Sequence, residues 1–144
     1  MPHRPIRTLV ATQRIITAPP DTLVTAAACA MKAAKVGALL VVENGKLAGI
    51  FTERDALFRV LAEGLDPAAT PLSQVMTANP QTIGADKPFG HAMHMMFEGG
   101  FRHVPVVDNG RPVGMVSARD ALGPEMEAFE SELRQREEIS EILG

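Results

Sequence analysis

The chain has 144 residues, of which 46% are hydrophobic and 22% are charged, and its formal net charge is −3. This composition is that of a globular protein and excludes an intrinsically disordered chain. The weak negative charge excludes a general electrostatic attraction to nucleic acid. A single cysteine, Cys29, excludes an internal disulfide and a cysteine-based zinc site.

The amino-terminal residues lack the long apolar stretch of a signal peptide. No apolar run in the chain approaches the roughly 18 residues that a membrane helix needs. We therefore expect a cytoplasmic protein that binds neither membranes nor nucleic acid.

The first half of the chain predicts a strand, a helix and a hairpin in that order. Asp21 is an acid suited to the start of the helix. Asn44-Gly45 separates the two hairpin strands, and Asn-Gly between apolar runs is the strongest short hairpin signal. The expected elements are an extended segment over Ile15–Thr17, a helix over Leu23–Lys35, and strands over Ala38–Glu43 and Leu47–Phe51.

A second helix completes this unit. It begins at Thr52, and the Gly- and Pro-containing connector Gly64–Pro71 follows it. The first half of the chain is therefore a β-α-β-β-α unit.

The second half repeats this unit at an offset of 65 residues. Residues 8–57 align without a gap against residues 73–122, and the match is densest between GALLVVENGKLAGIFTERDAL and RHVPVVDNGRPVGMVSARDAL. Repeats of this kind bury their apolar faces against each other. We expect an α/β fold with a pseudo-two-fold axis and two related clefts between the copies. The matching elements are Gln81–Ile83, Pro88–Glu98, His103–Asp108, Pro112–Val116 and a helix from Ser117.

The residues after the repeats are strongly acidic. Residues 125–144 contain seven Glu and two Arg, and Met126, Phe129 and Leu133 follow helical spacing. An amphipathic helix over residues 124–144 is expected. It either packs on its own domain or pairs with a partner chain.

Several motifs occur twice, in the same order and at one spacing. Together they resemble the CBS (cystathionine-β-synthase) domain pair, also called the Bateman module. On this resemblance, repeat 1 covers residues 8–64 and repeat 2 covers residues 72–123, which leaves the acidic helix over residues 124–144 outside the repeats. The motifs are GIFTERD with GMVSARD, VVENG with VPVVDNG, the link VMTANPQTI, and GGFRHVPVVD.

The resemblance implies a regulatory module rather than an enzyme. Such modules bind adenosine-containing ligands such as AMP, ADP, ATP, S-adenosylmethionine or NAD, and report them to an effector protein, here unknown. They commonly form homodimers, and no cofactor is required. The sequence shows no Ser-His-Asp order, metal triad or glycine-rich phosphate loop. The alternative is a structural or partner-binding regulatory subunit with degenerate ligand sites.

The resemblance assigns ribose binding to Asp55 and Asp120. Thr52 to Asp55 follows a strand and opens a helix, where free N–H groups favour phosphate and a carboxylate can accept bonds from a ribose diol. The same spacing is also a capping box, so the two roles stay open, together or singly.

The resemblance also implies that each cleft combines residues from both copies. Arg102 and His103 match the uncharged Gly37 and Ala38 in the repeat, so we expect the first cleft to depend more on phosphate than the second. Arg102 as a surface charge and His103 as a core histidine are the alternatives. The first cleft would comprise Thr52, Asp55, Thr82, Arg102 and His103, and the second Thr17, Gly37, Ala38, Ser117 and Asp120.

His91 and His94 lie three residues apart on one side of a predicted helix. Two nitrogen ligands are too few for a metal site, and the neighbouring methionines suit a protein core. We therefore expect no metal.

Overall fold

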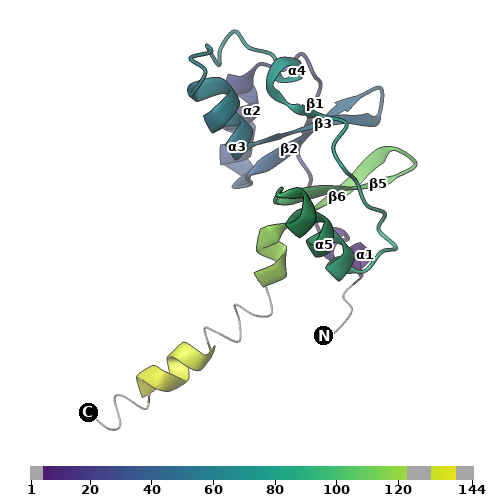
Figure 1. The fold of residues 1–144 in the computed structure, drawn as a ribbon, viewed down its shortest axis with the longest axis vertical. Coiled ribbons are helices and arrows are strands. Elements are labelled where there is room, and N and C mark those ends of the chain that lie inside the picture. Colours follow the sequence, from purple (N-terminus) through teal and green to yellow (C-terminus); the bar gives the residue numbers. More distant parts are fainter. Residues whose placement is uncertain (1–4, 123–130, 139–144) are drawn as a thin grey trace.

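The computed structural model describes residues 5–122 and 131–138 and has an α/β fold. The first repeat forms the upper half of the molecule in Figure 1, and the second repeat lies below it. The expected pair of tandem α/β repeats is confirmed. Within the described residues, no helix has the length and apolar character needed to cross a bilayer.

The first repeat builds a four-stranded sheet in the order β1-β2-β3-β4. Strand β1 pairs with β2 in parallel, and the β2–β3 hairpin and the β3–β4 pair are antiparallel. Strand β4 comes from the start of the second repeat and was not predicted from the sequence. The elements of the first repeat are β1 (Thr17–Ala18), α2 (Val24–Ala34), β2 (Ala38–Glu43), β3 (Lys46–Thr52), α3 (Glu53–Asp55) and the π-helix η1 (Ala56–Leu61). They are followed by α4 (Leu72–Val75) and β4 (Thr77–Ala78) of the second repeat.

The second repeat has a helix and a hairpin at the expected positions, but its sheet has only two strands. The extended segment expected over Gln81–Ile83 is reduced to a single parallel bridge between Ile83 and Val106. The expectation of a strand there is wrong, because only one residue of the segment pairs with the hairpin. The elements are α5 (Phe89–Gly99), β5 (His103–Asp108), β6 (Arg111–Ser117) and the 3-10 helix η2 (Ala118–Leu122).

Both hairpins turn at the predicted Asn-Gly pairs. Asn44 and Gly45 have φ angles of 54° and 77°, and Asn109 and Gly110 have φ angles of 51° and 81°. Two consecutive positive φ angles are what a tight hairpin turn between twisted strands requires. The turns also meet, since the Leu47 N–H donates to the Gly110 carbonyl at 2.9 Å.

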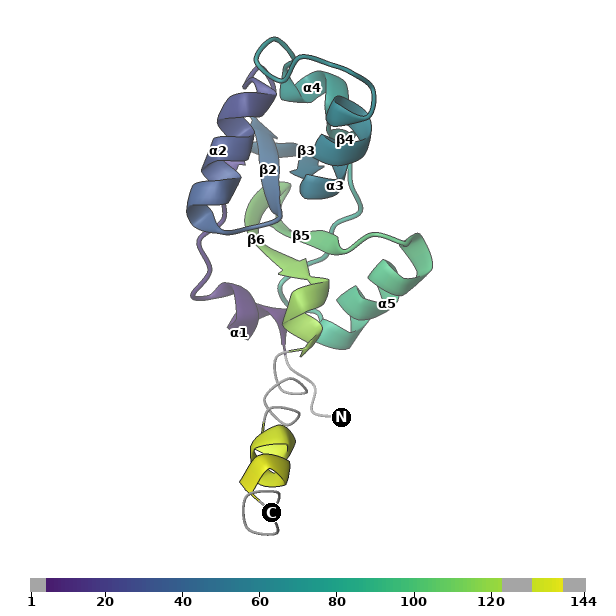
Figure 2. The ribbon, with the colours of Figure 1, turned by 90° about the vertical axis from the view of Figure 1, so that its left-hand side faces the viewer.

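The helix at the start of each repeat packs into the core of the other repeat. Helix α1 (Ile6–Val10) contributes Ile6 to the core that contains Phe89 and Val116 of the second repeat. Helix α4 contributes Leu72 to the core that contains Phe51 of the first repeat. Figure 2 shows α1 beside the second hairpin and α4 above the first. The two repeats therefore complete each other.

A third buried cluster joins the repeats between their hairpins. Ala38, Leu40 and Ile50 of the first repeat pack there with the partly buried Met115 of the second. Of the helix expected over residues 124–144, the structure describes residues 131–138, which are helical and exposed. Its remaining residues lie outside the described part.

Candidate ligand-binding cavities between the repeats

Two cavities open where the repeats meet. The first has a volume of about 850 Å³ and is lined from three segments, residues 50–59, 77–81 and 101–103. The second has a volume of about 770 Å³ and is lined by residues near 13–16, 31–38 and 115–120, together with three that also line the first cavity. Each is large enough for a nucleotide-sized ligand.

Eight of the ten residues expected from the sequence line the cavities. Thr52, Asp55, Arg102 and His103 line the first cavity, as expected. Four others line the second cavity: Gly37, Ala38, Ser117 and Asp120.

Thr17 and Thr82 do not line the cavities. Both are exposed, and in an extended chain successive side chains point to opposite sides. Their neighbours Ile16 and Gln81 line the second and the first cavity instead. The expectation was therefore displaced by one residue in each copy.

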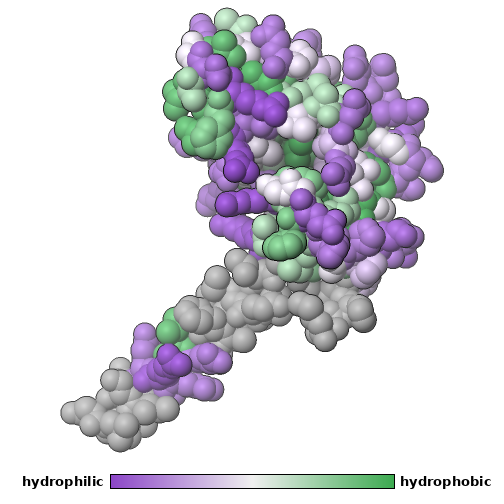
Figure 3. All heavy atoms as spheres, viewed as in Figure 1, coloured by the Kyte–Doolittle hydropathy of each residue, from purple (hydrophilic) through white to green (hydrophobic). Residues whose placement is uncertain are grey.

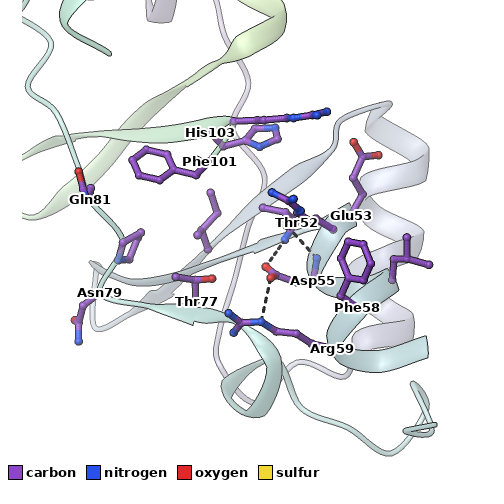
Figure 4. Close-up of a pocket in the computed structure, with 15 residues that line it drawn as sticks. Thr52, Glu53, Asp55, Phe58, Arg59, Thr77, Asn79, Gln81, Phe101 and His103 are labelled. Atoms are coloured by element: carbon purple, nitrogen blue, oxygen red, sulfur yellow. Dashed lines mark hydrogen bonds and ion pairs between the residues drawn. The ribbon is translucent and has the colours of Figure 1, made fainter. Parts of the chain in front are cut away.

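Asp55 caps the helix and lines the first cavity at the same time. Its carboxylate Oδ2 accepts from the Thr52 N–H at 3.0 Å, and its own N–H donates to Thr52 Oγ1 at 3.1 Å. Arg59 Nε lies 3.4 Å from the other carboxylate oxygen. Asp55 is only 8% exposed, so these partners hold a nearly buried carboxylate in one orientation at the cavity wall (Figure 4).

Asp120 occupies the matching place in the second cavity with a different set of bonds. Its Oδ2 accepts from the Ser117 N–H at 2.8 Å and from the Ser117 hydroxyl at 3.1 Å. The Ser117 hydroxyl therefore donates to the carboxylate, whereas the Thr52 hydroxyl accepts from the backbone.

Arg102 and His103 are held at the base of the second hairpin. The Arg102 carbonyl accepts from the Ala118 N–H at 2.9 Å, and His103 pairs with Ser117 in the sheet. Burial lowers the pKa of His103 below its ordinary value of 6.5, the carboxylates of Glu53 and Asp120 oppose this, and the Arg102 guanidinium reinforces it. The imidazole is therefore mostly neutral near neutral pH.

Much of the apolar and amide lining of the first cavity was not predicted from the sequence. Figure 4 shows Phe101 and Phe58 on opposite sides, and Thr77, Asn79 and Gln81 along the link. The last three belong to VMTANPQTI, which was recognised as a motif but not as a source of cavity residues.

The second cavity is richer in charge than the sequence suggested. Gly37 and Ala38 carry no charge, but the segments around them supply cations, among them Lys35. The expected weaker dependence of this cleft on phosphate stays a prediction. The cations that line it are Arg14, Lys32, Lys35, Arg102 and Arg119, against the acids Glu53 and Asp120.

No described His, Cys, Asp and Glu side chains gather in a group of three or more that could hold a metal ion. His94 pairs instead with Glu98, with 2.8 Å between Nε2 and Oε1.

The CBS domain family profile matches residues 6–62 and 72–124, which together form most of the chain. The chain belongs to the CBS domain family. It is 35% identical over 109 residues to the CBS domain-containing protein YhcV of Bacillus subtilis, with 76% of this chain and 77% of that protein covered.

Other relatives are much longer than this chain. It is 41% identical over 97 residues to CBSCBSPB1 of Arabidopsis thaliana, a match that covers 67% of this chain and 18% of that protein. The chain thus spans about a fifth of the length of such relatives.

Among solved structures, the chain is similar to the CBS domain pair of protein MJ0100. The TM-score is 0.76 at 27% sequence identity, and the match covers 91% of this chain and 99% of that one. That structure was solved in complex with 5′-methylthioadenosine and S-adenosyl-L-methionine.

Proposed function

We propose that this chain is a cytoplasmic regulatory module that binds an adenosine-containing, phosphate-bearing ligand of the AMP, ADP and ATP class in its two cavities. Ligand binding would change how the repeats pack and so report to an effector protein. The observation that carries this proposal is the pairing, in each cavity, of one fixed carboxylate from one repeat with at least one cation from the other.

The carboxylates suit a ribose diol. A carboxylate offers about four lone-pair sites, and Asp55 uses two of them on Thr52 and Arg59. The remaining lone pairs can accept hydrogen bonds from vicinal hydroxyls. The ligands bound by MJ0100 both contain adenosine, which supports the same recognition here.

The rest of the first cavity suits a base and a phosphate. Phe58 and Phe101 provide aromatic surfaces for an adenine ring, and Arg102 provides a charged donor for phosphate. Cations outnumber acids in both linings, which favours AMP over S-adenosylmethionine, because the latter carries a sulfonium cation.

Thermal unfolding and calorimetry with AMP, adenosine and S-adenosylmethionine test this proposal. We expect AMP to raise the melting temperature in a concentration-dependent way and to bind about tenfold more tightly than adenosine, since a charged hydrogen bond contributes roughly 1.5–3 kcal/mol. If none of the three ligands shifts the melting temperature, the sites are degenerate and the chain is a partner-binding subunit.

Two pairs of variants separate ribose from phosphate recognition. Asp55→Ala should weaken AMP and adenosine alike at the first cavity, whereas the exposed Glu63→Ala should weaken neither. Arg102→Ala should weaken AMP and spare adenosine, with the exposed Arg111→Ala as its control. An equal loss of both ligands in Arg102→Ala contradicts a phosphate role for Arg102.

We also propose a homodimer. Leu61 on η1 is 72% exposed and lies outside both cavities, and Figure 3 shows apolar residues gathered over this helix. Burial of this surface in a second copy would remove it from water. Light scattering should give twice the 15.4 kDa of one chain, and a monomer at tens of micromolar would contradict the proposal.

A further inference from the structure

Three residues line both cavities: Glu53 of the first repeat, and Arg102 and His103 of the second. We call them the shared wall. All other lining residues belong to one cavity alone. A ligand in either cavity therefore meets Glu53 and Arg102, in addition to the charged groups of its own cavity.

The backbone holds the shared wall in place from both sides. The Glu53 N–H donates to the Gly37 carbonyl at 2.9 Å, and the Ala118 N–H donates to the Arg102 carbonyl at 2.9 Å. A Cβ on Gly37 would lie 3.0 Å from Glu53 Oε1, so the glycine leaves room for this carboxylate over the second cavity. The wall is thus fixed at its main chain, while the exposed side chains of Glu53 and Arg102 can turn toward either cavity.

The shared wall carries one cationic side chain, Arg102, and one anionic side chain, Glu53. Its third member, His103, is mostly neutral near neutral pH, because its pKa is lowered by burial. A phosphate in one cavity can attract the Arg102 guanidinium. Of the shared wall, the other cavity then keeps only the Glu53 carboxylate beside its own cations, and it also feels the field of the first phosphate.

We propose that the two cavities are coupled through the shared wall, so that an anionic ligand in one weakens the binding of an anionic ligand in the other. This inference rests on the proposed function and adds its regulation. It makes the module respond over a wider range of ligand concentration than two independent sites would. An uncharged ligand does not compete for Arg102, so adenosine should bind the two cavities independently.

Calorimetry on single-cavity variants measures the coupling. Gln81→Trp places bulk at an exposed position that lines only the first cavity, and Lys32→Trp does so for the second. Asp55→Asn and Asp120→Asn form a second pair if the tryptophans do not reduce the stoichiometry. If the cavities are independent, the product of the two stepwise association constants of the unmodified chain equals the product from the two single-cavity variants.

For AMP we expect the product of the two association constants in the unmodified chain to be at least about fivefold smaller than the product from the two single-cavity variants. Fivefold is the lower end of typical coupling between sites. For adenosine we expect equal products. The AMP deficit should shrink as salt is raised from about 0.05 M to about 0.5 M, because exposed charges are screened. It should also shrink in Arg102→Ala but not in the control Arg111→Ala. A chain that binds one AMP, while each single-cavity variant also binds one, shows the same coupling in its strongest form.

Equal products for AMP overturn the coupling and leave the proposed function intact. A single-cavity variant that folds and binds nothing also overturns the coupling, and it restricts the proposed function to one cavity. An equal deficit for AMP and adenosine overturns the electrostatic route. Failure of the unmodified chain to bind either ligand overturns the proposed function itself.

Discussion

In the first repeat the central hairpin is extended on both sides by main-chain pairing, with β1 against β2 and β4 against β3. In the second repeat the equivalent positions are filled by a single bridge at Ile83 and by a side chain. Gln13 stands where the repeat places Ala78 of β4, and its amide donates to the Met115 carbonyl at 2.8 Å and accepts from the Met115 N–H at 3.0 Å. A side chain can thus replace a strand where only one residue needs partners.

The largest expected loss of stability comes from helices α1 and α4, each of which packs into the core of the other repeat. Ile6 and Leu72 are fully buried, so Ile6→Ala and Leu72→Ala should each cost about 2–5 kcal/mol of unfolding free energy. Chemical denaturation measures this. The exposed Phe97→Ala is the control and should change stability by less than about 0.5 kcal/mol.

Hydrogen exchange then shows which repeat each helix supports. At concentrations of denaturant below the transition, Ile6→Ala should loosen the amides of β5 and β6 first, and Leu72→Ala those of β2 and β3. If Ile6→Ala loosens β2 and β3 first, or Leu72→Ala loosens β5 and β6 first, each helix supports its own repeat and not the other one.

Gly49 and Gly114 occupy the same position in the two repeats, so substitutions there compare the packing on the two hairpins directly. A Cβ on Gly49 would lie 2.9 Å from the Thr77 carbonyl oxygen, and a Cβ on Gly114 would lie 2.5 Å from the Cβ of Val10. We expect Gly49→Ala and Gly114→Ala each to cost about 1–3 kcal/mol through overpacking, as measured by urea unfolding. Gly90, with open space around it, provides the control substitution Gly90→Ala. If neither Gly49→Ala nor Gly114→Ala lowers the stability, β4 and α1 do not pack closely on the hairpins.

The Gln13 bridge should have a smaller effect. Gln13→Ala removes two hydrogen bonds at the edge of β6 and should cost about 1–3 kcal/mol, since each contributes roughly 0.5–1.5 kcal/mol. Gln13→Glu keeps an acceptor for the Met115 N–H but turns a carboxylate oxygen toward the Met115 carbonyl oxygen, so its melting temperature should be at least as low as that of Gln13→Ala. If Gln13→Ala melts like the unmodified chain, the bridge does not replace the missing strand.

The smallest expected effect is the dependence of stability on pH that His103 causes. The first repeat has Ala38 at this position, so only the second repeat has a titratable side chain there. Burial lowers the pKa of His103 below 6.5 in the folded chain, so the unfolded chain binds this proton more readily. The stability from this group is complete above pH 6.5 and decreases as pH falls through the lower folded value. Melting temperatures between about pH 8 and about pH 5 should fall less in His103→Gln than in the exposed control His91→Gln.

Local signals were enough to predict the hairpins, because the conformation of Asn44-Gly45 and Asn109-Gly110 is set by the turn residues themselves. They were not enough for β4 or for the packing of α1. A strand of two residues has no periodicity, and the partners of α1 lie far along the chain.

The residues of the two cavities also fall into a group that local sequence signals predicted and a group that they did not. Asp55 and Asp120 follow strands in a repeated motif, so the sequence indicated them directly. Lys32 and Arg14 lie outside the repeated motifs, and they reach the second cavity only because the two repeats pack against each other. Short sequence motifs do not predict such contacts between distant segments.

The exchange of α1 and α4 also has a consequence for biosynthesis. The amino-terminal repeat cannot close its core until residues 72–75 have left the ribosome, although its own strands end at Thr52. Helix α1 is made before the strands of both repeats, yet its partners in β5 and β6 are among the last parts of the repeats to be made. Domains usually fold from the amino terminus during synthesis. Here helix α1 stays without its core partners until β5 and β6 have been made, and only then can the core of the second repeat form.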